Sequence, residues 1–338
     1  MRLFSVLVRC IAVILLLPLV LWAVGVFVYA GPSMPAVADA CALVVALVGI
    51  AATLGLFIRR LRPALYVLAA CLIATGLWWS SIHASNDRQW QTDVSVLPWA
   101  EIDGDRVVFH NVRNFDYRTE TDYTPAWYDH TYDLGKLDEV DIVAVYWMGD
   151  DIAHIMLSFG FGGEDYLAVS IETRKEVGES YSTLAGFFRR YELYYVVADE
   201  RDSIRLRTNY RKDPPEDVYL YRTSTPRENV RRLFLDYVRE INELRDHPKF
   251  YNTLTTNCTT SIWMHTQVNP NATPLNWKIL ASGHVPSYVY DIGRLDSSLP
   301  FEELRRRSRI NDVAHAADKA ADFSQRIRAG LPRPPVTP

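Results

Sequence analysis

Cys258 is the residue of this 338-residue chain whose type and setting most directly suggest chemistry. It lies in YNTLTTNCTTS (residues 251–261), where Asn257 is placed to cap a helix that begins at the cysteine. A thiol at the start of a helix lies beside unpaired backbone N–H groups and the positive end of the helix dipole, which favour the thiolate. The same N–H groups can hold an oxyanion during acyl transfer. The pattern predicts a cysteine nucleophile, with Asn257 and Thr259 supporting the oxyanion.

Cys258 stands apart from the other three cysteines, which lie in apolar runs: Cys10, Cys41 and Cys71. No CxxC pair is present, which excludes a zinc site built on cysteines. A lone cysteine is commonly a small packed hydrophobe. The Thr, Asn and Ser neighbours of Cys258 are poor core material, however. A buried structural thiol and a reactive thiol both stay open, and the neighbours favour the reactive one.

A thiol nucleophile needs a general base, usually a histidine, and His154 has the best position among the seven histidines after residue 83. It opens the strand-like run HIMLSFGF, which the turn GGED connects to DYLAVSIETRK. If this hairpin is centred on Gly163, His154 faces Glu172 with Cβ atoms about 5 Å apart. A carboxylate there can orient the imidazole, as the third member of a triad does. A slip of one residue would place Ile171 or Thr173 opposite instead.

Each of these residues also has an ordinary structural role. A strand histidine is more often structural than catalytic, and a strand glutamate usually faces solvent. Arg174 and Lys175 would ordinarily form a solvated strand end. Arg174 is nevertheless the candidate to bind a substrate.

The sequence around the three residues of this triad contains several strand-like runs followed by helical ones. This order predicts an α+β domain with an antiparallel sheet and helices packed beside it. After an aromatic, looped stretch at 84–135, strands are predicted at 140–148, 154–161, 165–175, 193–199, 203–209 and 217–223. A helix is predicted from TPRE, with Thr225 as N-cap and Pro226 at its first position. Further helices are predicted from Cys258 and over about 300–329. The domain is expected to cover 84–330, followed by a disordered Pro-rich tail at 331–338.

Residues 1–83 predict a membrane domain. They hold one acid and five bases, and they contain apolar runs at about 10–30, 37–58 and 64–82, each near the ~20 residues that cross a bilayer. A cleaved signal peptide would explain the first run but not the other two. Arginines precede the first run and lie between the second and third, so the positive-inside rule places both segments in the cytoplasm. We therefore expect a multi-pass inner-membrane protein with a cytoplasmic N-terminus and a periplasmic domain.

The charge of the periplasmic domain limits its partners. The chain has 36 basic and 40 acidic residues, and removing those of the membrane part leaves a net charge of about −8. A net acidic domain lacks the basic surface of a nucleic-acid binder. We find no phosphate loop, dinucleotide fingerprint or HExxH motif, so neither a cofactor nor a metal is predicted. The expected partners are the lipid bilayer and a lipoprotein or lipid substrate.

Several long stretches resemble the Lnb N-terminal periplasmic domain family: NVRNFDYRTETDYTPAW, AHIMLSFGF, LAVSIETRKEVGESYSTLAGFFRRYELYYVVADERD and YNTLTTNCTTSI. The resemblance covers roughly residues 100–320. It implies a papain-like thiol fold in permuted order, with Cys258 as nucleophile and His154 as base. In the lipoprotein transacylase that names the family, the periplasmic domain precedes the membrane helices, whereas here three apolar runs come first. The resemblance thus implies thiol acyl chemistry and leaves the acyl acceptor open.

The sequence therefore predicts a membrane-anchored periplasmic acyltransferase or hydrolase that works through a thioester on Cys258. Two other hypotheses stay open. One is a cysteine amidase or peptidase that acts on cell-wall peptide. The other is a non-catalytic envelope scaffold in which the cysteine only packs.

Overall fold

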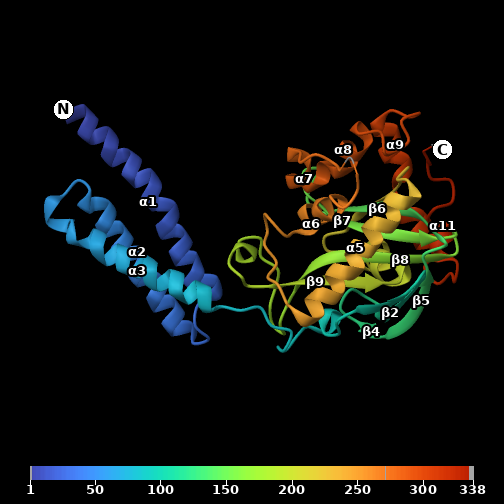
Figure 1. The fold of residues 1–338 in the computed structure, drawn as a ribbon, viewed down its shortest axis with the longest axis horizontal. Coiled ribbons are helices and arrows are strands. Elements are labelled where there is room, and N and C mark those ends of the chain that lie inside the picture. The colour runs from blue at the N-terminus through green and yellow to red at the C-terminus, as the bar shows by residue number, and fades with distance from the viewer. Residues whose placement is uncertain (1, 271, 335–338) are drawn as a thin grey trace. The chain divides into compact units, whose positions relative to one another are not determined.

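The structure of the chain, a computed structural model, describes residues 2–270 and 272–334 (Figure 1). It divides into two compact units. The first extends to Ser85 and also includes Tyr181–Tyr191, and the second comprises Asn86–Ser180 and the chain from Glu192 onward.

The first unit contains the three predicted apolar helices: α1 (Arg2–Ala30), α2 (Pro35–Gly55) and α3 (Pro63–Ser81). Pro35 and Pro63 each occupy the first helical turn, where the missing N–H costs nothing. All three helices are long and apolar enough to cross a membrane. The prediction of three such helices is confirmed, although α1 begins before the apolar run does.

The second unit is built on a mixed sheet with the order β1-β2-β9-β8-β7-β6-β10, and β5 pairs with β2. All neighbours are antiparallel except β2 and β9, which are parallel. The strands are β1 (Trp99–Asp103), β2 (Arg106–Arg113), β5 (Trp127–Asp133), β6 (Leu137–Tyr146), β7 (Ala153–Phe161), β8 (Asp165–Arg174), β9 (Glu192–Ala198) and β10 (Asp217–Arg222). A separate two-stranded ribbon joins β3 (Asp116–Tyr117) to β4 (Tyr123–Thr124).

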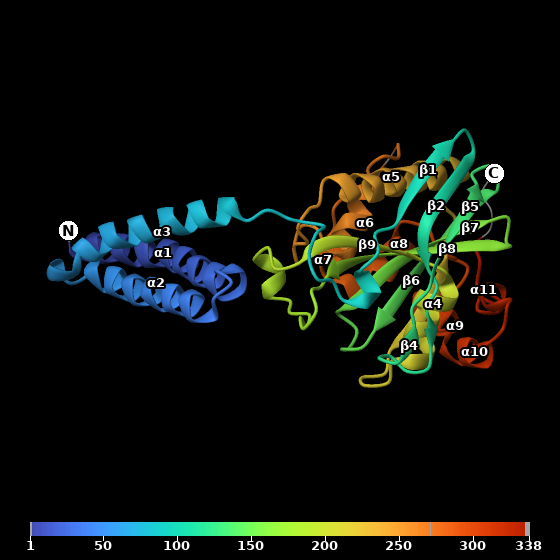
Figure 2. The same ribbon diagram turned by 90° about the horizontal axis from the view of Figure 1, so that it is seen from below.

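Helices cover both faces of the sheet (Figure 2). On one face, α5 (Arg227–Asp246) packs Phe234 against Phe159 of β7, and α6 (Cys258–Thr266) lies beside it. On the other face, α4 (Glu200–Arg205), α10 (Asn311–Ala316) and α11 (Phe323–Arg326) form one buried apolar cluster with β6, β7 and β10. The remaining helices are α7 (Trp277–Leu280), α8 (Val285–Asp291) and α9 (Phe301–Ser308). The predicted α+β class is confirmed.

Three predicted elements differ from the structure. Residues 203–209 are not a strand: α4 and a π-helical turn, Leu206–Tyr210, occupy them, because Asp199 caps α4 by accepting from the backbone N–H of Arg201. The helix expected from Thr225 begins at Arg227, with Pro226 in the cap position and no side-chain cap. The helix expected over about 300–329 is three short helices, α9, α10 and α11, separated by irregular turns.

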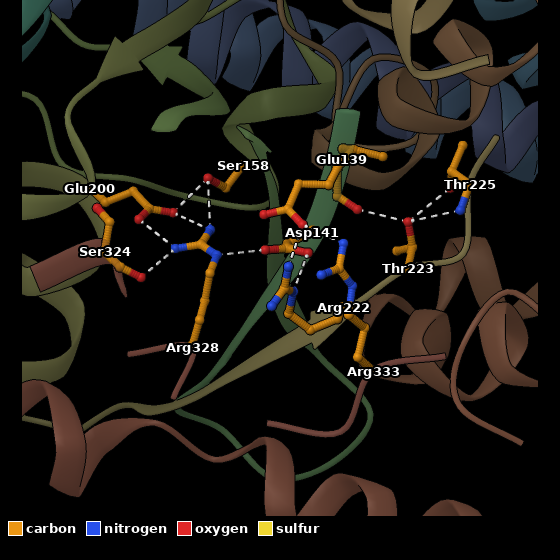
Figure 3. Close-up of polar contacts among 11 residues, drawn as sticks. Glu139, Asp141, Ser158, Glu200, Arg222, Thr223, Thr225, Ser324, Arg328 and Arg333 are labelled. Carbon is orange, nitrogen blue, oxygen red and sulfur yellow. Dashed lines mark hydrogen bonds and ion pairs between the residues drawn. The ribbon is translucent and has the colours of Figure 1, made fainter. Parts of the chain in front are cut away.

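A buried ionic network fixes the segment after α11 to the sheet (Figure 3). The guanidinium of Arg328 bonds Glu200 at 2.7 and 2.8 Å and Asp141 at 2.8 Å, and it lies 3.7 Å from the ring centre of Tyr166. Arg222 forms ion pairs with Asp141 and with Glu139. The acids would be costly to bury without these partners.

The predicted disordered tail falls partly outside the described residues, which end at 334. Residues 331–334 have no helix or strand, but Leu331 packs against the apolar cluster and Arg333 forms an ion pair with Glu139 at 3.2 Å.

Candidate functional site

The hairpin of β7 and β8 has the register predicted from its turn. Leu157 pairs with Val169 and Phe161 with Asp165, so the pairs are centred on Gly163. This ladder ends at Leu157 and Val169, and His154 and Glu172 lie beyond it, where the two strands are no longer paired. Their side chains still meet, with His154 Nε2 3.1 Å from Glu172 Oε1. The predicted pairing of imidazole and carboxylate is present.

Helix α6 begins at Cys258 with the predicted N-cap. Asn257 Oδ1 accepts from the backbone N–H of Thr260 at 2.9 Å, and Thr260 Oγ1 accepts from the backbone N–H of Asn257 at 3.0 Å. This reciprocal capping box fixes the first turn. Among the described residues, no acceptor is found for the backbone N–H groups of Cys258 and Thr259. These two donors are therefore available to an incoming oxygen.

Buried polar contacts hold α6 against the sheet, where it touches both β7 and β8. His265, on α6, bonds Asp236 of α5 through Nδ1 and the Tyr195 hydroxyl of β9 through Nε2, each at 2.7 Å. At the other end of the helix, Thr259 Oγ1 donates to the carbonyl of Ile279 at 2.6 Å. These contacts fix where the start of α6 lies relative to His154. They also assign His265 a structural role.

The electrostatics of Cys258 and His154 favour a charged pair. Burial alone would lower the pKa of His154, but Glu172 and the hydrogen bond to Cys258 outweigh it and raise the pKa to about 9. Burial would likewise raise the pKa of the Cys258 thiol. The hydrogen bond and charge of His154, with the backbone N–H of Ile155, lower it instead. Opposite shifts of a thiol and an imidazole are the condition for a thiolate–imidazolium pair near neutral pH.

Ser170 joins His154 to Glu172, and the sequence interpretation did not include it. It is buried on β8, two residues before Glu172 and therefore on the same face. Its Oγ lies 2.6 Å from His154 Nε2 and donates to Glu172 Oε1 at 2.7 Å. Because Nε2 is engaged here, the ring nitrogen left for Cys258 is Nδ1. The spacing of two residues on one strand was the available signal.

Glu172 is itself held by a chain of charges that the sequence interpretation missed. Arg207, in the π-helical turn, lies 3.3 Å from Glu172 Oε1 and 3.1 Å from Glu216 Oε1. Arg211 also bonds Glu216, at 2.9 Å. Burial would raise the pKa of Glu172, but His154, Arg207 and Ser170 hold it well below its usual range. The carboxylate therefore stays ionised beside the imidazole, although 29% of its side chain is exposed.

Two predicted site residues have structural partners. The Asn257 amide accepts from the first turn of α6 and donates to the carbonyl of Thr253 at 2.7 Å, so it shapes the site as the helix cap.

Arg174 is not brought to the site. Its guanidinium is buried over the Trp90 ring and donates to Asn86 and to two backbone carbonyls, those of Val94 and Ser95. Arg174 fastens the segment before β1 to β8, because all three guanidinium nitrogens donate to residues of that segment.

No group of three potential metal ligands lies together within residues 2–270 and 272–334.

Comparison with known proteins supports the resemblance noted in the sequence. Residues 123–283 match the Lnb N-terminal periplasmic domain family. This is the family that the sequence resembles. The matched residues, an Lnb-like domain, run from β4 to η5 (Ser282–His284) and include His154, Ser170, Glu172 and Cys258. No curated protein and no solved structure matches the chain.

The match to a periplasmic domain family and the three helices long and apolar enough to cross a bilayer fit a membrane protein with a periplasmic domain.

Replacing Ser170 by alanine is expected to lower any activity that depends on Cys258 about 10-fold, because His154 and Glu172 lose their shared hydrogen-bond partner. Without this acceptor the pKa of His154 should fall below about 9. The alkaline limb of the pH–rate profile, where the imidazolium loses its proton, should then move to lower pH. Ser170→Thr keeps the hydroxyl, so it should retain most of the rate and most of the original position of the alkaline limb. If Ser170→Ala lowers the rate but leaves the alkaline limb of the pH–rate profile unchanged, Ser170 contributes only to packing.

Proposed function

We propose that the chain is a membrane-anchored periplasmic cysteine acyltransferase or hydrolase that takes acyl groups from a lipid or lipoprotein through a thioester on Cys258. The observation that carries the proposal is a thiol at the start of the helix that packs on β7 and β8, together with an imidazole on β7 whose Nε2 bonds Ser170 and Glu172. The opposed pKa shifts of Cys258 and His154 support the same assignment.

The first half of the reaction forms the thioester. His154 Nδ1 holds the proton of the Cys258 thiol, and the thiolate attacks the ester carbonyl of the donor. The carbonyl oxygen becomes an oxyanion, which the backbone N–H groups of Cys258 and Thr259 can hold. The imidazolium then gives its proton to the departing alcohol oxygen as the C–O bond breaks. Glu172 stabilises the imidazolium throughout.

The second half transfers the acyl group. An amine or a water molecule enters as the alcohol leaves. It attacks the thioester carbonyl, and neutral His154 removes a proton from this attacking amine or water. The C–S bond breaks and the thiolate is restored beside the imidazolium. An amine acceptor gives transfer and a water acceptor gives hydrolysis, with the same groups in the same roles.

An apolar cavity near the start of α6 favours a long acyl group over a peptide. The cavity has a volume of about 140 Å³, and its walls include Thr259 and Ile155, the chain neighbours of Cys258 and His154, which do not themselves line it. Its walls are mainly aliphatic and include Leu157, Ile262 and Val289. An apolar pocket of this kind is suited to a hydrocarbon chain. A charged cell-wall peptide would leave its polar groups unpaired there.

The membrane orientation belongs to this proposal. Arg2 and Arg9 in the first part of α1 and the arginines around η1 (Arg59–Leu61) favour a cytoplasmic N-terminus, and three crossings would then place the Lnb-like domain outside the inner membrane. The order of histidine strand before cysteine helix fits a permuted papain-like fold.

The proposal is tested by mass spectrometry of the full chain in lipid nanodiscs. A diacylated lipopeptide, a phospholipid and a soluble muropeptide are offered separately. We expect a hydroxylamine-labile acyl mass on Cys258 with a lipid donor, and none in Cys258→Ser. Labelling by the muropeptide alone would favour the amidase or peptidase, and labelling by no donor would favour the scaffold.

Narrowing the cavity should separate long donors from short ones. Ile262→Trp adds a large side chain to the cavity wall, so thioester formation from a long-chain donor should slow at least about 10-fold, while an acetyl donor should react as before. Met264→Trp is the matched control, because Met264 lies on the same helix, is 44% exposed and does not line the cavity. Equal effects on both donors would count against an acyl-chain pocket.

A further inference from the structure

Residues 181–190, inserted between β8 and β9, belong to the helical unit, and we name them the interfacial segment. The Phe188 ring stacks on Tyr29 of α1 with ring centres 5.3 Å apart. Gly25 makes this approach possible, since a Cβ there would lie only 2.3 Å from the Phe188 ring. The segment therefore packs on α1 close to where that helix ends at Ala30.

Two arginines of the interfacial segment bond the ends of the apolar helices. Arg189 Nη1 donates to the carbonyl of Trp79 at 2.7 Å and to that of Ile82 at 3.1 Å, and its guanidinium lies 4.5 Å from the Trp79 ring centre. Arg190 Nη1 donates to the carbonyl of Tyr29 at 3.5 Å. The last carbonyls of a helix lack partners within it and carry the negative end of its dipole. The segment thus binds the C-terminal ends of α1 and α3, which lie at one side of the helical unit.

The same segment exposes large apolar side chains. Tyr181 is 51% exposed, Leu184 60% and Phe187 38%, and the last of these ends a short 3₁₀ turn, η3 (Ala185–Phe187). Three such side chains within seven residues would be unfavourable in water. They lie in a segment fixed to the ends of membrane-spanning helices, the level at which a bilayer changes from hydrocarbon to headgroups.

We propose that the interfacial segment is a second membrane contact of this chain, in which Tyr181, Leu184 and Phe187 enter the boundary between headgroups and acyl chains. Aromatic side chains with arginine beside them are characteristic of that boundary. The occupant is the bilayer rather than another protein, because the segment is already bound to helices that the bilayer surrounds. This inference goes beyond the proposed acyl chemistry and does not depend on it.

Site-directed spin labelling of the full chain in phosphatidylcholine–phosphatidylglycerol nanodiscs tests the proposal. Labels are introduced as Leu184→Cys or Phe187→Cys in a chain whose four cysteines are alanine. We expect both labels to collide several-fold more with dissolved oxygen than with a water-soluble nickel chelate. Val313→Cys, on α10 and 41% exposed, is the control and should show the reverse.

Two results would overturn the proposal. One is chelate accessibility at 184 and 187 equal to that at 313, which would place the segment in water. The other is dipolar broadening at 184 that disappears when labelled chains are diluted with unlabelled ones, which would identify a second copy as the occupant. Thermal unfolding of each variant confirms that it is folded. Thioester formation is irrelevant to this readout, since the background lacks Cys258.

Discussion

Replacing His154 by alanine is expected to lower the rate of acyl transfer by about 100- to 10,000-fold. In the proposed mechanism, the variant loses the group that holds the thiol proton, protonates the leaving alcohol and activates the acceptor. It also loses the charge and hydrogen bond that lower the pKa of Cys258, so less thiolate is present at neutral pH. The measurement is the rate of thioester formation and of product release with the lipid donor that labels the wild type.

His130→Ala is the matched control for this variant. His130 also lies on a strand of the Lnb-like domain, but its nearest acid is Asp165, 3.6 Å away, and it has no contact with Cys258. Its replacement should leave both rates unchanged. Equal losses in the two variants would point to general destabilisation, and full activity in His154→Ala would remove His154 from the mechanism.

Replacing Arg328 by methionine is expected to destabilise the periplasmic unit by about 3–5 kcal/mol. Methionine has similar length but leaves the buried carboxylates of Glu200 and Asp141 without their main cation (Figure 3). Burial already raises the pKa of Asp141 to about 6, and Arg328 opposes that rise. Arg328 interacts with the ionised form of Asp141, so the destabilisation should be largest near pH 7 and shrink toward pH 5, as Asp141 takes up a proton.

Urea unfolding of the full chain in detergent, at both pH values, measures this loss. Arg326→Met provides the control, because Arg326 lies in the same segment but pairs with Asp322 at the surface, with both side chains more than half exposed. The Arg326→Met substitution should alter the free energy of unfolding by no more than about 0.5 kcal/mol. A similar small effect for Arg328→Met would show that the network contributes little to stability.

Local signals in the sequence were enough to predict the central part of the site. The turn GGED fixes the register of β7 and β8, and the register brings His154 near Glu172. Asn257 followed by Thr260 is a capping pattern, and it starts α6 at Cys258. These features depend on residues close together in the chain, so they can be recognised without the fold.

Features that depend on the fold were missed or assigned differently. Residues 203–209 have strand-like composition, yet the cap at Asp199 starts a helix, and the π-helical turn that follows directs Arg207 to Glu172. Nothing local distinguishes Arg174 from a substrate ligand. Its partners Asn86, Val94 and Ser95 lie about 80 residues earlier in the chain.

The polar run around Cys258 also has a different physical explanation from the one expected. Thr259, Thr260 and Ser261 are buried, although their composition suggested exposure. Thr259 and Thr260 satisfy their hydroxyls in the helix cap and at Ile279, which lets polar residues pack beneath the site. The neighbours of the cysteine thus build the helix start that the chemistry needs.

The central claim is that His154 makes Cys258 a reactive thiol. The pH dependence of Cys258 alkylation tests this claim most directly. The full chain is used with Cys10, Cys41 and Cys71 replaced by alanine, and iodoacetamide reacts with the one remaining thiol. We predict an apparent thiol pKa below the ordinary value of about 8.5 and an upward shift in His154→Ala. Superimposable profiles for the two proteins, each with an ordinary thiol pKa, would contradict it.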